Sequence, residues 1–228
     1  ADISWTTSGS ETDWEVVVQP AGTGEPSGSG TAATTNPFTF SGLTAAMDYE
    51  VYVRANCLSD GFSTWAGPIN FTTACDVFIP EYLEDFTTII PNCWDEANNG
   101  DGVTGPTDLG SGSWVADEYL NIGTGDGAYK INLYSNFKSD WILSPQIDLT
   151  GGPFQLDFDF AIMDWNSSTV AGTLGSDDTV EVYITTDNWV TWTNLLTFDN
   201  TTVVPATGTQ IVYNLSAYSG QIVQFGIL

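Results

Sequence analysis

Apolar and polar residues alternate along this chain in short runs, and Gly, Pro, Asn and Asp separate the runs. Alternation with a period of two indicates strands whose two faces meet different surroundings. The runs that predict strands are residues 14–18, 49–53, 129–133, 156–162, 180–184 and 211–215. No segment carries an apolar stripe at helical spacing over three turns. The pattern therefore predicts an all-β chain, and strands of this length suit β-sandwiches.

Charge is the second strong feature of the chain. Three basic residues, Arg54, Lys130 and Lys138, face 29 acidic ones, and the net charge is −26. Such a surface repels phosphates and anionic lipid, so we expect no nucleic-acid partner. No run of about 18 apolar residues occurs, so we expect no membrane insertion. The acidity has two readings: solubility in a saline medium, or neutralisation of some carboxylates by a hard cation such as calcium.

Composition also restricts the chemistry. Hydrophobic residues make up 42% of the 228 residues, so the chain is expected to fold, and its length suits two domains. Histidine is absent, which excludes Ser-His-Asp and Cys-His catalysis and most zinc sites. An enzyme here would have to use paired carboxylates, for which Asp157 and Asp159 are the candidates. Alternation explains this pair more simply, because strand residues between inward apolar ones point to water. We expect no enzyme.

Several stretches within residues 1–74 form one ordered pattern: ISWTT, DWEVVV, FTFSGLTAAMDYEVYVRANC and STWAGPINFTT. Leu43 stands six residues before Tyr49, which opens a strand-like run. This arrangement is similar to a tyrosine corner. The segment resembles a fibronectin type III domain over nearly its whole length. The resemblance implies a further strand before Ala1, so we expect this domain to be trimmed at its N-terminus.

Residues 76–228 carry a second ordered set of stretches: YLEDFTTIIPNCW, SDWILSPQIDL, DDTVEVYITTDNWVTWTNL and YNLSAYSGQIVQFGI. Together they resemble the MAM-like jelly-roll modules known as cleaved-adhesin domains, which occur in the haemagglutinin regions of gingipain-type secreted bacterial proteins. The resemblance implies a jelly-roll β-sandwich. Such modules continue into an acidic terminal strand that is absent here. We therefore expect this domain to be truncated as well, with an unpaired sheet edge.

The resemblance also implies a structural calcium ion. In this family, carboxylates on the opening strand and near the central loop help to hold the ion, and these positions correspond here to Glu84 and Asp85, and to Asp177 and Asp178. Four carboxylates supply the hard oxygen ligands that calcium prefers. The missing acidic strand would often contribute to this site. The alternative is that all four are solvated charges at strand ends.

A separate acidic run, residues 95–108, invites comparison with a calcium loop. The sequence DEANNGDGVTGPTD fails the EF-hand pattern, because Ala97 occupies the third position and Pro106 the twelfth, where a bidentate Glu belongs. We interpret the run as an acidic, glycine-rich surface loop.

Three cysteines stand at positions 57, 75 and 93. If Cys57 and Cys75 end two neighbouring antiparallel strands of the fibronectin-like domain, they lie at opposite ends of it, roughly 20 Å apart. A disulfide requires Cα atoms within about 7 Å. The sequence therefore favours a Cys75–Cys93 disulfide across the domain junction and leaves Cys57 alone. The alternative is three reduced cysteines.

Two residues are candidates for contacts with other molecules. Nine tryptophans are many for this length, and Trp165, in the polar stretch MDWNSST, is the one most expected to be exposed and to stack on a sugar ring. Thr179 lies in an Asp-Thr-Val pattern that resembles a bacterial O-glycosylation acceptor. The alternatives are core or turn packing for Trp165 and an ordinary strand position for Thr179.

The stretch Thr185–Trp192 resembles an Asp-box, a turn motif found in sialidases. It departs from the pattern at Thr185, which replaces Ser, and at Trp189, which stands where Gly belongs. In such a turn the aspartate accepts hydrogen bonds from backbone N–H groups while the tryptophan packs beneath. We therefore expect Asp187 to have a structural role.

These patterns favour a non-catalytic adhesion or display module of a large secreted or cell-surface protein, stabilised by calcium and one disulfide. Its partners would be neighbouring modules of the same polypeptide and either a glycan or a surface protein. The alternative is a carbohydrate-binding accessory region of a secreted hydrolase or peptidase whose catalytic domain lies outside these residues.

Overall fold

The computed structural model describes residues 1–7, 9–88, 90–123, 127–134 and 137–228. It is 40% strand and 4% helical, and its sheets are antiparallel, so the prediction of an all-β chain is confirmed. The chain divides into two compact units, Ala1–Asp76 and Val77–Leu228. This division lies next to the boundary expected at residues 74–76.

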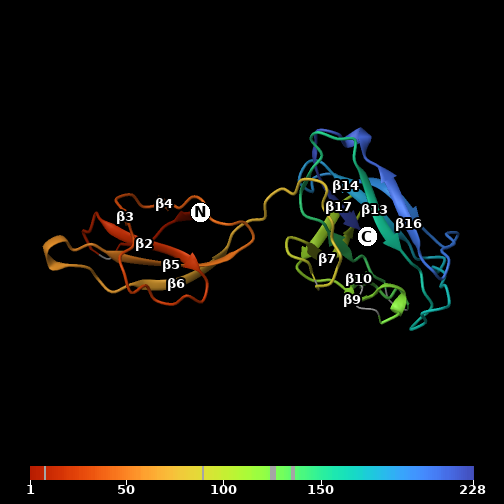
Figure 1. The fold of residues 1–228 in the computed structure, drawn as a ribbon, viewed down its shortest axis with the longest axis horizontal. Coiled ribbons are helices and arrows are strands. Elements are labelled where there is room, and N and C mark those ends of the chain that lie inside the picture. Colours follow the sequence, from red (N-terminus) through yellow and green to blue (C-terminus); the bar gives the residue numbers. More distant parts are fainter. Residues whose placement is uncertain (8, 89, 124–126, 135–136) are drawn as a thin grey trace. The chain divides into compact units, whose positions relative to one another are not determined.

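The first unit contains one four-stranded sheet and one two-stranded sheet (Figure 1). Its elements are β1 (Asp2–Ile3), β2 (Trp14–Pro20), β3 (Thr31–Ala33), β4 (Phe38–Thr39), β5 (Asp48–Ala55), the 3₁₀ turn η1 (Leu58–Asp60) and β6 (Ala66–Thr72). The larger sheet has the order β3-β2-β5-β6, and β1 pairs with β4. All these pairings are antiparallel.

The core of the first unit lies between these two sheets. Ile3 of β1, Val16 of β2 and Val51 of β5 are buried together, and Trp5 and Trp14 pack against them. The Tyr49 hydroxyl accepts a hydrogen bond from the Thr44 N–H at 2.9 Å. This is the geometry expected of a tyrosine corner.

The second unit is built from a larger sheet and two strand pairs. Its elements are β7 (Asp95–Asp101), β8 (Gly105–Leu109), β9 (Val115–Glu118), η2 (Tyr119–Asn121), β10 (Gly127–Lys130), β11 (Trp141–Leu143), β12 (Ile147–Asp148), β13 (Gln155–Phe160), β14 (Val180–Thr185), β15 (Thr193–Phe198), β16 (Thr209–Asn214), η3 (Ser216–Tyr218) and β17 (Ile222–Ile227). The large sheet runs β15-β14-β17-β11-β7-β8, with β12 also paired to β17. β13 pairs with β16, and β9 with β10.

Each face of the large sheet carries its own apolar cluster. On one face, Val180 and Val182 of β14 pack with Phe158 of β13 and Ile211 of β16, so the β13–β16 pair covers this face (Figure 1). A separate cluster joins Trp141 of β11 to the segment that follows β14; its members are Ala97, Trp141, Leu143, Tyr183, Trp189, Trp192 and Leu228. β13 alternates as predicted, with Asp157 and Asp159 exposed between half-buried apolar residues.

Two local predictions need correction. The strand expected at 129–133 ends at Lys130. The acidic run 95–108, interpreted above as a surface loop, is a β-hairpin formed by β7 and β8. Asp101 makes the turn, because its carboxylate accepts hydrogen bonds from the N–H groups of Val103 and Thr104. Hydrogen bonds from an Asp side chain can hold a tight turn, so this hairpin forms although its sequence does not alternate between apolar and polar residues.

Candidate functional sites

Three of the four residues predicted to bind calcium, Glu84, Asp85 and Asp178, accept local hydrogen bonds. Glu84 accepts hydrogen bonds from the Phe86 N–H and the Tyr82 hydroxyl. Asp85 accepts two from Thr87, and these bonds lower the pKa of its carboxyl group.

The second acidic pair lies in the turn before β14. Asp177 is exposed, and Asp178 accepts a hydrogen bond from the Gly175 N–H at 2.9 Å. Within the part of the chain that the structure describes, no three or more His, Cys, Asp or Glu side chains are grouped to hold a metal ion. The structure therefore does not gather Glu84, Asp85, Asp177 and Asp178 into one such group.

A different pair of carboxyl groups is buried where β7 pairs with β11 in the large sheet. Glu96 of β7 and Asp140, just before β11, are each 5% exposed. One oxygen of Asp140 accepts a hydrogen bond from the Ser113 N–H at 2.7 Å. The Glu96 Oε1 atom is buried and has no hydrogen-bond partner in the described structure. Burial, Asp140 and Asp95 together raise the pKa of the Glu96 carboxyl group.

These features fit a cation. A buried carboxylate next to a second carboxylate is costly unless a positive charge compensates both or a proton neutralises one of them. Glu96 carries an unpaired oxygen, and calcium takes carboxylate oxygens, backbone carbonyls and water as ligands. Burial raises the pKa of the nearby Tyr129 hydroxyl, the hydrogen bond with the Ile90 N–H opposes this, and the charges of Glu96 and Glu84 raise the pKa further.

Sequence reasoning missed Glu96 and Asp140. Glu96 stands in the run interpreted as a loop, so its burial was not expected. The available signal was Asp140, an acid directly before the strand Trp141–Leu143, all three of whose residues are buried. Asp140 is buried together with this strand, and a buried carboxylate needs a partner.

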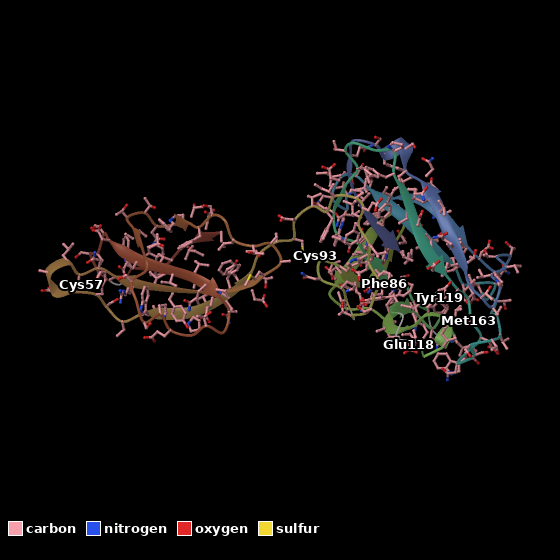
Figure 2. All side chains as sticks on the ribbon, viewed as in Figure 1. Cys57, Phe86, Cys93, Glu118, Tyr119 and Met163 are labelled. Carbon is pink, nitrogen blue, oxygen red and sulfur yellow. The ribbon has the colours of Figure 1, made fainter. Side chains whose placement is uncertain are left out.

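Trp165 is the most exposed tryptophan described. The residue is 64% exposed, and the sequence predicted its exposure. Trp165 lies in the loop after β13. This loop contacts η2 at the end of the unit where Figure 2 labels Tyr119 and Met163. Hydrogen bonds hold the two segments together: the Tyr119 hydroxyl donates to the Phe160 carbonyl, and the Asn121 amide donates to the Ser167 carbonyl.

Polar side chains lie beside this indole. The Lys130 ammonium is 5.8 Å from the ring centroid of Trp165, donates to Asn121 Oδ1 at 3.3 Å and pairs with Asp117. Burial would raise the pKa of Asp117, but hydrogen bonds from Lys130 and the Glu118 N–H more than offset burial and lower it. We call Trp165, Asn121, Lys130 and Asp117 the Trp165 surface.

The structure contains one disulfide. Cys75 and Cys93 are the disulfide-bonded cysteines, and Cys57 is a free, half-buried thiol on the turn after β5 (Figure 2). This differs from the alternative of three reduced cysteines. Thr179 is exposed just before β14, and its glycosylation stays a prediction.

The turn at 185–192 has the expected hydrogen bonds. Asp187 accepts hydrogen bonds from the Thr191 N–H at 2.9 Å, from the Thr191 hydroxyl at 2.6 Å and from the Thr185 hydroxyl at 2.8 Å. Trp189 and Trp192 pack against the buried Trp141 cluster. Asp187 therefore has the structural role that the sequence predicted.

Comparison with known proteins gives no match that bears on these sites. No protein-family model matches the chain, and no match was found among curated proteins or among solved structures. Over the residues that the structure describes, no helix is both long and apolar enough to cross a membrane.

Proposed function

We propose that this chain is a non-catalytic adhesion or display module of a large secreted or cell-surface protein, and that the Trp165 surface binds a neutral glycan. The observation that carries this proposal is the exposure of Trp165 beside hydrogen-bonding side chains. Single exposed apolar side chains are common on protein surfaces, so the support comes from the polar side chains that surround this indole, because a ligand can use both. The proposal of secretion rests on the sequence resemblance, and the disulfide is compatible with it.

The chemistry of the Trp165 surface suits a sugar. The flat indole stacks on the C–H face of a pyranose ring, while Asn121, Lys130 and Asp117 offer donors and acceptors for its hydroxyl groups. Lys130 is already paired with Asp117, and the chain carries a net charge of −26. Sulfated or carboxylated glycans are therefore repelled, whereas a neutral glycan is not.

Replacing Trp165 with alanine is expected to weaken binding to a neutral glycan by about tenfold or more, since removal of a central aromatic contact costs at least about 1.4 kcal/mol. Trp165→Phe should lose less, because part of the stacking face remains. A glycan array identifies the ligand, and isothermal titration calorimetry measures the affinity.

Tyr134, which is 83% exposed and has no described contact with Trp165, supplies the matched control. Tyr134→Ala should bind as tightly as the native chain. Binding that is lost equally in both variants, or retained in Trp165→Ala, would contradict the proposal. The alternative role is a carbohydrate-binding accessory region of a secreted hydrolase or peptidase. It would use the same Trp165 surface, but the parent polypeptide would then contain one catalytic domain.

We also propose that calcium stabilises the second unit, with Glu96 and Asp140 as the side chains that hold it. The support is the pair of buried carboxylates and the unpaired Glu96 oxygen. The ion would compensate two negative charges that the fold brings together. It has a structural role in this proposal.

Adding calcium is expected to raise the melting temperature of the native chain by several degrees relative to chelator, since an ion at 100 times its dissociation constant contributes about 2.7 kcal/mol. Glu96→Gln should abolish this rise. In chelator, Glu96→Gln should melt at or above the temperature of the native chain, because it removes an uncompensated buried charge. Differential scanning calorimetry measures both effects.

The double variant Asp177→Asn/Asp178→Asn distinguishes the Glu96–Asp140 site from the calcium ligands expected from the resemblance. It should keep the calcium-dependent rise. If the calcium-dependent rise in melting temperature disappears in the double variant but survives in Glu96→Gln, the calcium site lies in the turn before β14. If calcium does not raise the melting temperature of the native chain, the calcium proposal is wrong.

A further inference from the structure

A short segment lies against the buried pair formed by Glu96 and Asp140. It consists of residues 110–114, with the sequence Gly-Ser-Gly-Ser-Trp, and joins the end of β8 to the start of β9. We call it the 110–114 strap. Its first two residues are exposed and its last three are half-buried. The second half of the strap therefore packs against the protein, although it belongs to no strand.

The first contacts of the strap are with Glu96. The Gly110 N–H donates a hydrogen bond to the Glu96 carbonyl at 2.8 Å. Gly112 lies directly on the Glu96 side chain, because a Cβ atom at position 112 would be 3.0 Å from Glu96 Oε2 and 3.3 Å from Glu96 Cβ. The absence of a side chain at position 112 therefore leaves the space that the Glu96 carboxylate occupies.

The last two residues of the strap are bonded to Asp140. The Ser113 N–H donates to Asp140 Oδ1 at 2.7 Å, and the Trp114 indole N–H donates to the Asp140 carbonyl at 3.2 Å. The bond to the carboxylate is the stronger kind, since its acceptor is charged. One five-residue segment thus holds both acids of the pair.

Access to the pair requires a movement of the chain. Glu96 and Asp140 are each 5% exposed, and Glu96 Oε1 is buried without a partner in the described structure. An ion in solution therefore cannot reach this oxygen while the site is closed. Glu96 belongs to β7, and Asp140 directly precedes β11, which pairs with β7 in the large sheet. Separating these strands would open the sheet, whereas moving the strap breaks only a few hydrogen bonds.

The protein has no cation of its own for this pair. The chain contains three basic residues, and each is engaged elsewhere: Arg54 with Glu15, Lys130 with Asp117, and Lys138 with the Asn132 carbonyl. A cation that compensates Glu96 and Asp140 must therefore come from solution and pass the strap.

We propose that the 110–114 strap is the gate of the Glu96–Asp140 site, so that a calcium ion enters and leaves only while the strap is open. This inference rests on the proposed calcium function and adds its regulation. In the closed state, Ser113 holds the Asp140 carboxylate and Gly112 leaves room for that of Glu96. A gate of this kind sets the rates of binding and release together, while the carboxylates determine the affinity.

A variant at Trp114 tests the gate. Trp114→Phe keeps an aromatic ring but lacks the N–H that donates to Asp140. It should release calcium about threefold to tenfold faster than the native chain, the range for one neutral hydrogen bond, while Kd changes by less than about twofold. Stopped-flow mixing of the calcium-loaded chain with a fluorescent chelator measures the release rate, and calorimetry measures Kd. Glu96→Gln, which removes a ligand, should instead weaken Kd.

Two variants within the strap form a matched pair. Gly112→Ala places a methyl group against Glu96, whose carboxylate must then move, so calcium should bind about tenfold more weakly. Ser111→Ala is the control, because Ser111 is exposed and its hydroxyl donates to the Asp108 carbonyl. It should leave both Kd and the release rate unchanged. Thermal unfolding in chelator shows whether each variant is folded.

Hydrogen exchange of the Ser113 amide, followed by nuclear magnetic resonance in chelator, tests the strap without calcium. The amide should be protected in the native chain and should exchange faster in Trp114→Phe, by the same factor as calcium release. If the native chain binds no calcium, the calcium proposal fails and the gate fails with it. If calcium binds but leaves Trp114→Phe and the native chain at the same rate, or if the Ser113 amide is unprotected, the gate alone is wrong.

Discussion

Replacing Trp141 with alanine is expected to lower the free energy of unfolding of the second unit by about 3–5 kcal/mol. Trp141 is fully buried, and its ring lies 5.3 Å from the rings of both Tyr183 and Trp192. Truncation would leave a cavity between β11, β14 and the segment after β14. Gly226 lines the same space, since a Cβ atom there would lie 2.9 Å from the Trp141 ring. Urea denaturation followed by circular dichroism measures the loss.

Two further variants test the physical cause. The buried Trp141 N–H has no partner in the structure as described. Trp141→Phe keeps much of the apolar volume and removes this unpaired donor, so it should cost much less than alanine. Trp165→Ala, at an exposed position, should change stability by no more than about 0.5 kcal/mol. Equal losses for Trp141→Ala and Trp165→Ala would show that burial does not determine the effect.

Replacing Arg54 with alanine is expected to destabilise the first unit by about 2–4 kcal/mol, from hydrogen bonds to a charged partner and two cation–π contacts. Arg54 donates to one carboxylate oxygen of Glu15 through Nε at 2.9 Å and through an amino nitrogen at 2.6 Å. Its guanidinium lies 4.4 Å from the Phe62 ring centroid and 4.3 Å from that of Trp65. The side chains of Arg54 and Glu15 are 17% and 12% exposed. Screening by solvent is therefore weaker than for a surface pair.

Arg54→Lys separates charge from geometry. Lysine keeps the positive charge but has no planar group to lie over Phe62 and Trp65 while donating twice to Glu15. We expect an intermediate loss. If Arg54→Lys were as stable as the native chain, charge alone would explain the interaction; if Arg54→Ala were harmless, the cluster would have no stabilising role. Thermal unfolding of the variants in low and high salt distinguishes these cases.

The sequence was sufficient where a residue's role is set by its neighbours in the chain. Alternation located β2, β5, β13, β14 and β16, and the polar surroundings of Trp165 indicated its exposure. The hydrogen bonds of Asp187 follow from Thr185 and Thr191, which lie within four residues of it. In each case the signal and its structural consequence lie in the same short segment.

The sequence was insufficient where distant segments meet. The hairpin β7–β8 carries Asn, Asp and Gly in place of alternating apolar residues, so its strands gave no periodic signal. Glu96 and Asp140 are 44 positions apart, and only the pairing of β7 with β11 brings their segments together. Pairing of strands across such separations depends on the whole sheet.

The scarcity and engagement of basic residues have a consequence for proteolysis. Trypsin-like enzymes cut after Lys or Arg and need an extended, accessible backbone around the bond. Arg54 lies in β5, which is paired on both sides by β2 and β6, and Lys130 ends β10, where it pairs with Val115 of β9. Cleavage at Arg54 therefore requires opening of the central sheet of the first unit. Protection of Arg54 and Lys130 against such enzymes is built into the same contacts that hold the fold together.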